Sequence, residues 1–418
     1  MGGVKMRKLQ EVKLGELCDF INGGAWSDKE YVPEGIPVLK VTNCKNSGFV
    51  LDDINYLPYS SKQKYSQNEL HLNDVIIATV GSHPNLVNSS AGRSVIVNST
   101  VVGYYLNQNA VCIRTKDANV LNQLYFGYYS KYYLFQNYIQ MRGKGAANQM
   151  RIAISAIKDY PFPLPPIDYQ LHISTILSHY DTLIENYQKQ IKLLEEAAQR
   201  LYKEWFVELR FPGYESTKIV DGVPEGWKEE KVTESEHFHY AKCRITPFDG
   251  TRTYYATADV DNTYICSVGT PINYDNKPSR AQIQPSQNSV WFARMSNSYK
   301  IIGFAKRNDN RRRTSILSSG FAGFESPYYN FGFLYCLISS KWFNDQKNRF
   351  ATGATQVSLT NEGLSRIKFL SPDTKLVKDF SLKTNRIIEN IFLLREGCFK
   401  LTEARDRLLP KLMGGEIQ

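Results

Sequence analysis

The chain lacks the features that mark membrane, secreted and nucleotide-hydrolysing proteins. No apolar run approaches the roughly 18 residues that cross a bilayer, and residues 1–10 lack the apolar core of a signal peptide. The seven cysteines are scattered singly without CxxC spacing, which favours reduced thiols in a cytoplasmic protein. No GxxxxGK[ST] loop, GxGxxG loop or Asn-Pro-Pro-aromatic tetrapeptide is present. These absences argue against a nucleotide-binding site and an amino-methyltransferase loop in this chain.

The composition is otherwise ordinary for a soluble globular protein, with 42% hydrophobic and 22% charged residues. A length of 418 residues predicts two to four domains, each able to bury its own core. The formal net charge is +10. Such a balance favours an anionic partner, although charge alone does not identify nucleic acid.

An internal repeat is the most informative feature of the sequence. Gly145-Ala146-Ala147-Asn148-Gln149 and Gly353-Ala354-Thr355-Gln356 each precede a short apolar stretch, a proline joint and a long helical pattern. Their offset is 208 residues, about half of the chain, and Phe135 and Phe343 keep this offset in the preceding aromatic segments. A duplicated chain tends to fold with approximate two-fold symmetry, which suits a nearly symmetric partner such as duplex DNA.

Two segments carry the 3.5-residue apolar repeat of a coiled coil. The first runs from residue 173 to 205 without interruption, and the second runs from 377 to 412 with imperfections at Thr384 and Arg405. Each apolar seam must be buried, and the simplest way is to pack the two helices against one another. Because the helices follow equivalent domains, a two-fold relation between the domains makes them antiparallel. We therefore predict an antiparallel coiled coil, rather than two helices that pack separately on their own domains. The seam positions are Ile173, Leu177, Tyr180, Ile184, Tyr187, Ile191, Leu194, Ala198, Leu201 and Trp205 in the first segment, and Val377, Phe380, Ile387, Ile391, Leu394, Cys398, Leu401, Leu408 and Leu412 in the second.

The remaining sequence predicts two mixed domains, so that the fold class is α+β. Residues 1–166 form the first domain, 167–213 the first long helix, 214–371 the second domain and 372–418 the second long helix. In the first domain, residues 36–41 and 74–80 are typical of strands. Tyr-rich residues 125–138 predict one amphipathic helix, and the prolines at 161, 163, 165 and 166 predict a stiff joint without regular structure.

Charge separates the helices from the domains. Residues 181–210 have a net charge of −1 and residues 372–418 a net charge of +2, which leaves +9 for the rest of the chain. The mixed domains are therefore the expected anion binders, and the helices resemble neutral scaffolding.

Two possible catalytic or metal-binding groups were weighed against simpler explanations. Asp221 with Glu229-Glu230-Lys231 contains a fragment of a nuclease motif, but an acid followed two residues later by lysine is common by chance. His237, His239 and Cys243 do not match a standard zinc spacing. We interpret these last three residues as part of a polar surface strand, and we predict no catalytic and no metal-binding residues.

Several passages together resemble the DNA specificity subunits of type I restriction-modification enzymes, and in their order and spacing they extend over the whole chain. They are Lys13-Leu14-Gly15-Glu16-Leu17 leading to Gly23-Gly24, Ile36-Pro37-Val38-Leu39-Lys40-Val41-Thr42-Asn43, Asp74-Val75-Ile76-Ile77-Ala78-Thr79-Val80-Gly81-Ser82, the run from Gly145 through Pro163-Leu164-Pro165-Pro166 and Gln170 to Leu177-Ser178, Asp181 and Ile184-Glu185, Val223-Pro224-Glu225-Gly226-Trp227, and the tail Arg405-Asp406-Arg407-Leu408-Leu409-Pro410-Lys411-Leu412-Met413 with Gly415-Glu416-Ile417. The second domain diverges most from the family, above all over residues 231–277.

The resemblance implies a sequence-specific DNA-binding subunit without catalysis of its own. It implies two target-recognition domains that each read one half of a bipartite double-stranded DNA site, and a helical rod that sets their spacing. Two DNA methyltransferase subunits dock on such a subunit and methylate adenine with S-adenosylmethionine, and two restriction and translocase subunits add ATP and Mg²⁺. No cofactor is then expected in this chain. A coiled-coil scaffold without DNA specificity and the recognition part of a fused restriction-modification enzyme are the alternatives.

The candidate DNA-binding residues lie in turns or at the ends of predicted strands, where side chains can reach a groove. Arg and Lys pair with guanine or phosphate, and Asn and Gln pair with adenine. The adjacent arginines 311–313 diverge and are expected to hold phosphate rather than to read bases. The candidates are Lys40, Thr42, Asn43, Ser82, Arg93, Arg142, Lys144, Asn148 and Gln149 in the first domain, and Arg280, Arg294, Ser296, Lys306, Arg307, Arg311, Arg312, Arg313 and Gln356 in the second.

Overall fold

The computed structural model describes residues 10–45, 48–51, 53–82, 90–145, 149–306, 309–354 and 356–416. The chain divides into two compact units. The first unit comprises residues 1–183 and 401–418, and the second unit comprises residues 184–400. Each of the two long helices, α5 (Ile167–Tyr202) and α10 (Thr374–Met413), contributes to both units. Across the described ranges, no helix is long and apolar enough to span a membrane.

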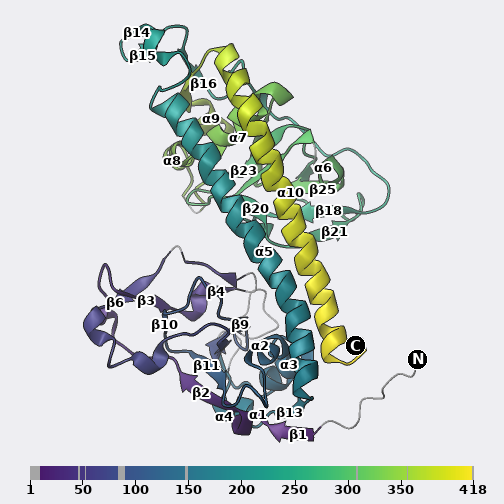
Figure 1. Ribbon diagram of the computed structural model, residues 1–418. Coiled ribbons are helices and arrows are strands. Elements are labelled where there is room, and N and C mark those ends of the chain that lie inside the picture. Colours follow the sequence, from purple (N-terminus) through teal and green to yellow (C-terminus); the bar gives the residue numbers. More distant parts are fainter. Residues whose placement is uncertain are drawn as a thin grey trace. The chain divides into compact units, whose positions relative to one another are not determined.

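In the first unit, short strands and helices precede α5 in the sequence (Figure 1). Its strands are β1 (Gln10–Lys13), β2 (Cys18–Asn22), β3 (Ile36–Leu39), β4 (Cys44–Lys45), β5 (Gly48–Phe49), β6 (Asn55–Leu57), β7 (Val75–Ala78), β8 (Val80–Gly81), β9 (Ser94–Ile96), β10 (Tyr105–Leu106), β11 (Ala110–Thr115), β12 (Met150–Arg151) and β13 (Pro161–Leu164). Its shorter helices are α1 (Leu14–Leu17), α2 (Gln123–Tyr129), α3 (Tyr133–Met141) and α4 (Ile154–Lys158).

The second unit repeats this order of elements after a hairpin of β14 (Ile219–Val220) and β15 (Val223–Pro224). Its further strands are β16 (Lys228–Lys231), β17 (His239–Tyr240), β18 (Arg252–Tyr255), β19 (Val260–Asp261), β20 (Tyr264–Ile265), β21 (Thr270–Ile272), β22 (Ala281–Ile283), β23 (Ser289–Ala293), β24 (Ile301–Phe304), β25 (Ser315–Ser318), β26 (Phe321–Glu325) and β27 (Lys368–Ser371). Its shorter helices are α6 (Asp309–Thr314), α7 (Phe331–Ile338), α8 (Lys341–Arg349) and α9 (Asn361–Ser365).

The two domains share one sheet topology. The central sheet has the order β2-β11-β7-β9 in the first domain and β17-β26-β23-β24 in the second, and its described pairs are antiparallel. A smaller sheet contains one parallel pair in each domain, β3 with β10 and β18 with β25. The shared order confirms the internal repeat as a repeat of structure, and with it the predicted mixed fold.

A two-stranded ribbon closes each domain next to its long helix. In the first domain β13 pairs antiparallel with β1, and in the second β27 pairs antiparallel with β16. The prediction of an irregular joint from Pro161 to Pro166 was therefore wrong for residues 161–164. Pro161 and Pro163 alternate along a strand that has only one partner, where a missing N–H on the open side leaves the ladder intact.

The aromatic segment of each domain forms two helices rather than one. In the first domain α2 ends at Tyr129 and α3 begins at Tyr133, so the prediction of a single helix over residues 125–138 was wrong. By the same offset α7 corresponds to α2 and α8 to α3; the side chain of Asn122 caps α2, and the side chain of Ser340 caps α8. Phe135 and Phe343 occupy equivalent positions on α3 and α8 and are both buried, as their common offset predicted.

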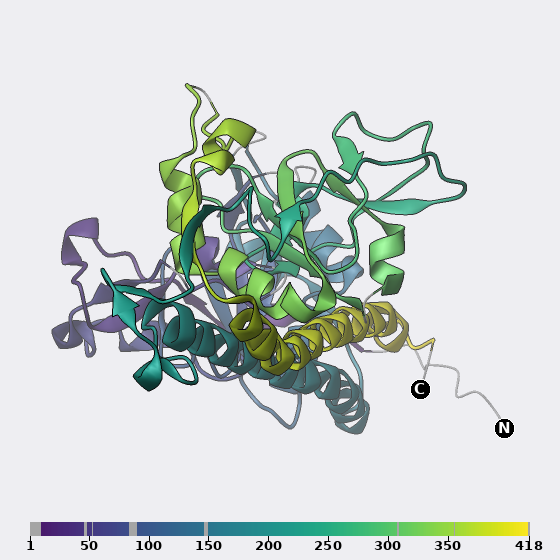
Figure 2. The same cartoon turned by 90° about the horizontal axis from the view of Figure 1, so that it is seen from above.

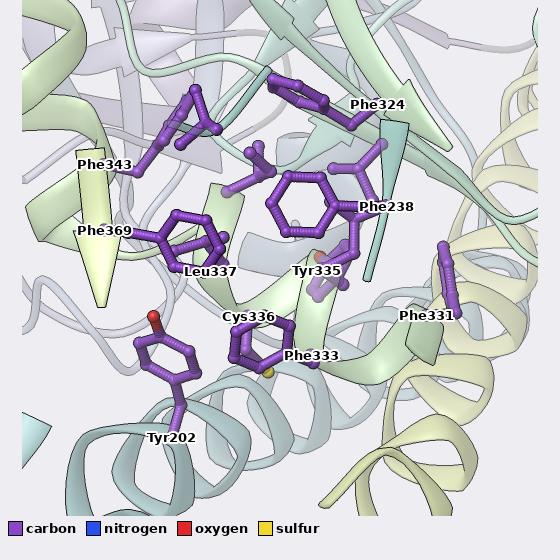
Figure 3. Close-up of a cluster of buried hydrophobic side chains, with 14 of the residues drawn as sticks. Tyr202, Phe238, Phe324, Phe331, Phe333, Tyr335, Cys336, Leu337, Phe343 and Phe369 are labelled. Carbon is purple, nitrogen blue, oxygen red and sulfur yellow. The ribbon is translucent and has the colours of Figure 1, made fainter. Parts of the chain in front are cut away.

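Aromatic side chains fill the core of the second unit. Figure 3 shows Tyr202 of α5 beside Phe333 and Cys336 of α7, with Phe238, which directly precedes β17, and Phe369 of β27 above them. Tyr202 and Phe333 lie 6.0 Å apart between ring centroids, and Phe238 and Phe369 lie 5.7 Å apart. In the first unit an equivalent core joins α2 and α3 to residues of both long helices, including Ile173, Leu177, Leu409 and Leu412.

The long helices pack side by side and antiparallel, as the seam predicted (Figures 1 and 2). In the first unit the Tyr169 hydroxyl donates to the Leu412 carbonyl at 2.9 Å. In the second unit the Cys398 thiol lies 3.9 Å from the Ile184 carbonyl. All predicted seam residues of both helices are buried or half-buried. Each helix also packs on its own domain, so the two arrangements weighed from the sequence are both present.

Two ion pairs hold the helices together at polar positions. Arg405, one imperfection of the seam, donates to Asp181 at 2.5 Å in the first unit. In the second unit Arg395 pairs with Glu195 and donates to the Thr263 hydroxyl at 2.6 Å. The other imperfection, Thr384, is buried and donates to the carbonyl of Phe380 within its own helix. The polar seam residues are thus satisfied rather than exposed.

Candidate nucleic-acid interface

A glycine-containing loop lies at the end of the central sheet in the first domain. We call residues 144–151 the first glycine loop. Its β12 pairs with β8, which follows the central strand β7, and Lys144 and Arg151 exchange backbone hydrogen bonds of 2.8 Å. Gly145 has φ of +129°, and a Cβ there would lie 2.2 Å from the Gln149 carbonyl oxygen, so glycine is required. The loop exposes the predicted residues Lys144 and Gln149.

The second domain builds the same loop from different residues. We call residues 352–358 the second glycine loop. Gly353 has φ of +138°, and a Cβ there would lie 2.4 Å from the Gln356 carbonyl oxygen. Ser296, which follows the central strand β23, donates from its backbone to the carbonyl of Val357 at 3.0 Å. The glycines of the sequence repeat, Gly145 and Gly353, therefore both have positive φ beside a backbone carbonyl, and Gln149 and Gln356 are both exposed.

The remaining candidates of the first domain lie near the same end of β7, and some of them serve the fold. Arg93 donates to the Cys44 carbonyl at 2.6 Å, and burial lowers its pKa. Asn43 is buried, accepts from the backbone of Lys40 and donates to Val50. Asp259 caps the equivalent turn of the second domain in the same way, through the backbone of Ala256. The Asn43 side chain thus has a structural role that the sequence did not reveal.

Lys40, Thr42 and Arg142 are more accessible. The Lys40 ammonium donates to Asn55 at 2.8 Å and lies 5.1 Å from the centre of the Tyr31 ring. Thr42 is exposed. Arg142 is exposed and stacks on Tyr138 at 3.4 Å from its ring centre. Ser82 is half-buried at the end of β8. Asn148 of the first domain and Arg307 of the second lie outside the described residues.

In the second domain the structure separates the candidates into two groups. Arg294 and Ser296 follow the carboxyl end of β23. The Arg294 backbone N–H donates to the Gly320 carbonyl, and the neighbouring Ser319 N–H donates to the carbonyl of Arg280, which is exposed. Arg294 is held inside the fold by Leu359, Tyr240 and Asn361.

Lys306 and the arginines of α6 form the other group, beside the amino end of β23. Phe304 pairs with Ser289 at that end, and Arg312 donates to Pro285 at 3.5 Å. Arg311 lies 5.5 Å from the ring centre of Phe399 on α10. Lys306 and Arg313 are exposed, whereas Arg311 and Arg312 are half-buried. The densest basic cluster of the sequence is therefore not part of the second glycine loop.

The sequence analysis missed a ladder of cations and aromatic rings beside the smaller sheet of the second domain. The Arg252 guanidinium lies 4.2 Å over Phe248, Phe248 meets Tyr274 edge-on at 5.7 Å, and Lys277 lies 4.1 Å over Tyr274. In the first domain Lys64 stacks on Tyr65 in a similar manner, at 4.5 Å. Stacking of this kind holds the cations in place against the rings. Aromatic residues interleaved with basic ones are the signal that could have identified this group.

No catalytic or metal-binding group emerges from the described part of the chain. No cluster of three or more His, Cys, Asp or Glu side chains there has the geometry to hold a metal ion. His239 is exposed and pairs with Glu325 at 2.9 Å, and Cys243 lies 3.7 Å from the same carboxylate. The prediction of a polar surface strand was wrong for His237, which is fully buried, contacts the Pro372 carbonyl at 3.0 Å and has its pKa lowered by burial.

Comparison with known proteins agrees with this arrangement. Residues 6–196 match the family model described as the type I restriction modification DNA specificity domain. The putative type I restriction enzyme MjaX specificity subunit of Methanocaldococcus jannaschii is 20% identical over 97% of this chain and 93% of its own length. The MjaIX specificity subunit of the same organism is 24% identical over 75% of this chain and 72% of its own length.

The fold is also that of a solved specificity subunit. The S subunit of a type I restriction-modification system from M. genitalium matches with a TM-score of 0.55 and 15% identity, over 98% of each chain. The repeated mixed domains and paired helices thus share the fold of this S subunit. Over residues 6–196 and along most of its length, the chain is therefore similar to type I restriction-modification specificity subunits.

Proposed function

We propose that this chain reads a bipartite DNA site for a type I restriction-modification complex, with one half-site assigned to each domain. The observation that carries the proposal is the repeated geometry at the end of the central sheet. Both domains present a glycine loop beside the segment that directly follows the central strand, β8 after β7 and residues 295–296 after β23, but the exposed side chains differ between them. One scaffold with two sets of exposed residues suits two different half-sites.

The proposed contacts fall into three classes. Lys144, Gln149 and Gln356 are exposed on the glycine loops and are the first candidates for base edges, with Thr42 and Arg280 beside them. Arg142 and the cations stacked on aromatic rings suit phosphate contacts. Asn43, Arg93 and Arg294 donate to groups within their domains and act by supporting these surfaces.

The chain itself contributes recognition and not catalysis in this proposal. S-adenosylmethionine belongs to two partner methyltransferase subunits that methylate adenine in each half-site, and ATP with Mg²⁺ belongs to two restriction subunits. The paired helices set the spacing of the half-sites and dock the methyltransferases. Because the proposed target is chromosomal DNA, we place the complex in the cytoplasm of a prokaryotic cell.

Genome-wide mapping of N6-methyladenine tests this function. Cells that carry the methyltransferase are compared with and without this chain. We expect a gapped motif with two fixed half-sites that loses its methylation when the chain is absent. A continuous motif, or methylation that does not change in active cells, would contradict the proposal.

A binding experiment distinguishes the proposal from a scaffold role. The complex is incubated with a duplex that carries the mapped site and with an unrelated competitor of equal length. Specific protein–DNA complexes are typically 10³-fold or more tighter than non-specific ones. Equal competition by both duplexes would favour the coiled-coil scaffold.

A further inference from the structure

Helix α8 holds the turn between β23 and β24 at two points. The Lys347 ammonium donates to the Ser298 carbonyl oxygen. The next residue, Asn348, accepts from the Asn297 backbone N–H at 3.0 Å, and Asn297 has a left-handed φ of +53°. Both contacts act on the backbone of the turn, so they fix its shape whatever side chains it carries.

The same turn borders the second glycine loop. Ser296 donates from its backbone to Val357, and Met295 forms a bridge with Ser358. Met295, Asn297 and Val357 are exposed. Lys347 therefore lies directly behind the surface that we assign to the second half-site, without being part of that surface.

The burial of Lys347 is costly for the fold. Its residue is only 2% exposed, and it lies among Phe292, Ile301 and Phe343 around a cavity of about 10 Å³. A cavity of this size is at the lower limit for a water molecule, and no carboxylate in the described ranges pairs with the ammonium. Burial lowers the pKa of Lys347 to about 8. Lysine is rarely buried in this way unless a partner requires it.

The first domain shows that the fold does not need a lysine here. Ile139 occupies the equivalent position on α3, at the offset of 208 residues, and it is fully buried. The connection that α3 faces is also different, because residues 79–93 join β7 to β9 whereas only residues 294–300 join β23 to β24. Lys347 is therefore found with the short turn 294–300 of the second domain and is not a requirement of the framework that both domains share.

We infer that Lys347 is a positioning residue for DNA reading, which fixes the Ser298 carbonyl and so presents residues 295–297 to the half-site of the second domain. This inference rests on the proposed function. Lys347 is then expected to affect the discrimination of one half-site and to leave that of the other half-site unchanged. An apolar substitution is expected to preserve folding, as Ile139 does in the first domain, and to loosen the turn.

Half-site discrimination of the full chain, assembled with its methyltransferase, tests the inference. Lys347→Met is compared with Lys341→Met, which removes an exposed charge from the same helix. Four duplexes carry the mapped site, each half-site scrambled in turn, and both scrambled. Gln356→Ala identifies the half-site that the second domain reads.

We expect Lys347→Met to reduce discrimination at that half-site about tenfold and to leave the other half-site within twofold. Discrimination by the wild type at the same half-site should decline between pH 7 and 9, because a neutral amine donates more weakly to the carbonyl. This decline should be absent in Lys347→Met. A folded Lys347→Met that keeps full discrimination, or that loses both half-sites equally, would overturn the inference. Failure of the proposed function itself would instead appear as no discrimination by the wild type.

Discussion

The two mixed domains have the same strand order in their central sheets, but the connections at the ends of these strands differ. In both central sheets the strand that leads into α2 or α7, which is β11 or β26, lies between the edge strand β2 or β17 and the hairpin strand β7 or β23. At the carboxyl end of this hairpin strand, residues 79–93 of the first domain correspond to the short turn 294–300 of the second. At its amino end only the second domain has the basic helix α6. The framework is thus conserved between the halves, while the connections vary.

This difference separates two kinds of residue. Framework residues, such as Phe135 and Phe343, keep both their offset and their burial. Helix residues that face the variable connections exchange chemical type, as Ile139 on α3 and Lys347 on α8 do. Side chains that differ between the halves at the same place in the fold are therefore the best candidates for sequence discrimination.

The largest expected effect is a loss of stability when an ion pair between α5 and α10 is broken. Arg395→Met leaves Glu195 without its cation and removes the donor to Thr263, so it should lower the free energy of unfolding by about 3 kcal/mol. Arg405→Met should lower the free energy of unfolding by less, about 2 kcal/mol. Asp181 still accepts a hydrogen bond from the Tyr128 hydroxyl at 2.7 Å when the arginine is removed.

Urea denaturation monitored by circular dichroism measures both changes. The double variant Glu195→Leu with Arg395→Met should recover most of the loss, since it leaves no unpaired buried charge. A double variant as unstable as Arg395→Met alone would show that packing, and not the charge, accounts for the cost.

The second prediction concerns the pH dependence of stability at Lys347. Its folded-state pKa of about 8 lies below the ordinary value of 10.5. The unfolded chain therefore binds this proton more tightly, so wild-type stability should rise as the pH increases from about 8 to 10.5. Lys347→Met should remove that rise and be more stable at pH 7 by roughly 2 kcal/mol. Thermal unfolding of both proteins at pH 7 and pH 9.5 measures the difference, and parallel pH profiles would refute the burial argument.

The third prediction compares the two glycine loops. Gly145→Ala and Gly353→Ala each place a Cβ against a backbone carbonyl at positive φ, at a local cost of about 1–2 kcal/mol. Each variant should weaken binding to one half-site about tenfold, and the two variants should affect opposite half-sites. Gly103→Ala, where a Cβ meets no atom within 4 Å, controls for a general effect of alanine at positive φ. If both loop variants weakened the same half-site, the assignment of one loop to each half-site would be wrong.

The smallest expected effect per substituted residue is the loss of DNA affinity at the arginines of α6. Replacing Arg311, Arg312 and Arg313 by Gln should weaken binding to every duplex alike and reduce the salt dependence by at most about one counterion per lost phosphate contact. Lys228, Lys231 and Lys368 are matched controls because each is already paired with a glutamate. Binding titrations at 50–200 mM salt make the comparison, and an unchanged slope in the triple arginine variant would rule out a phosphate role.

The sequence predicted those parts of the fold that depend on a regular pattern. The seam of α5 and α10 was predictable because its apolar residues recur over many turns. The break between α2 and α3 was missed because aromatic residues continue through it. The strand at Pro161–Leu164 was missed because its stability depends on β1, about 150 residues earlier.

The candidate interface was predictable only in part. The glycine loops could be found because they occur twice. The structural roles of Arg93 and Arg294 could not, since their hydrogen-bond partners lie 49 and 65 residues away in the sequence. That of Asn43 was missed because its local partners, Lys40 and Val50, form an irregular turn rather than a periodic element. The position of α6 away from the second glycine loop depends on the direction of β23 in the sheet, which spacing in the sequence does not specify.

The contribution of α10 to the first unit has a consequence for biosynthesis. Leu409, Leu412 and Met413 pack into the same core as Phe126 and Phe162, which the ribosome produces some 250 residues earlier. The second unit requires nothing beyond residue 400. During translation the domain made first is therefore completed last, and a nascent chain that stalled before residue 401 would expose an unfinished core to chaperones and proteases.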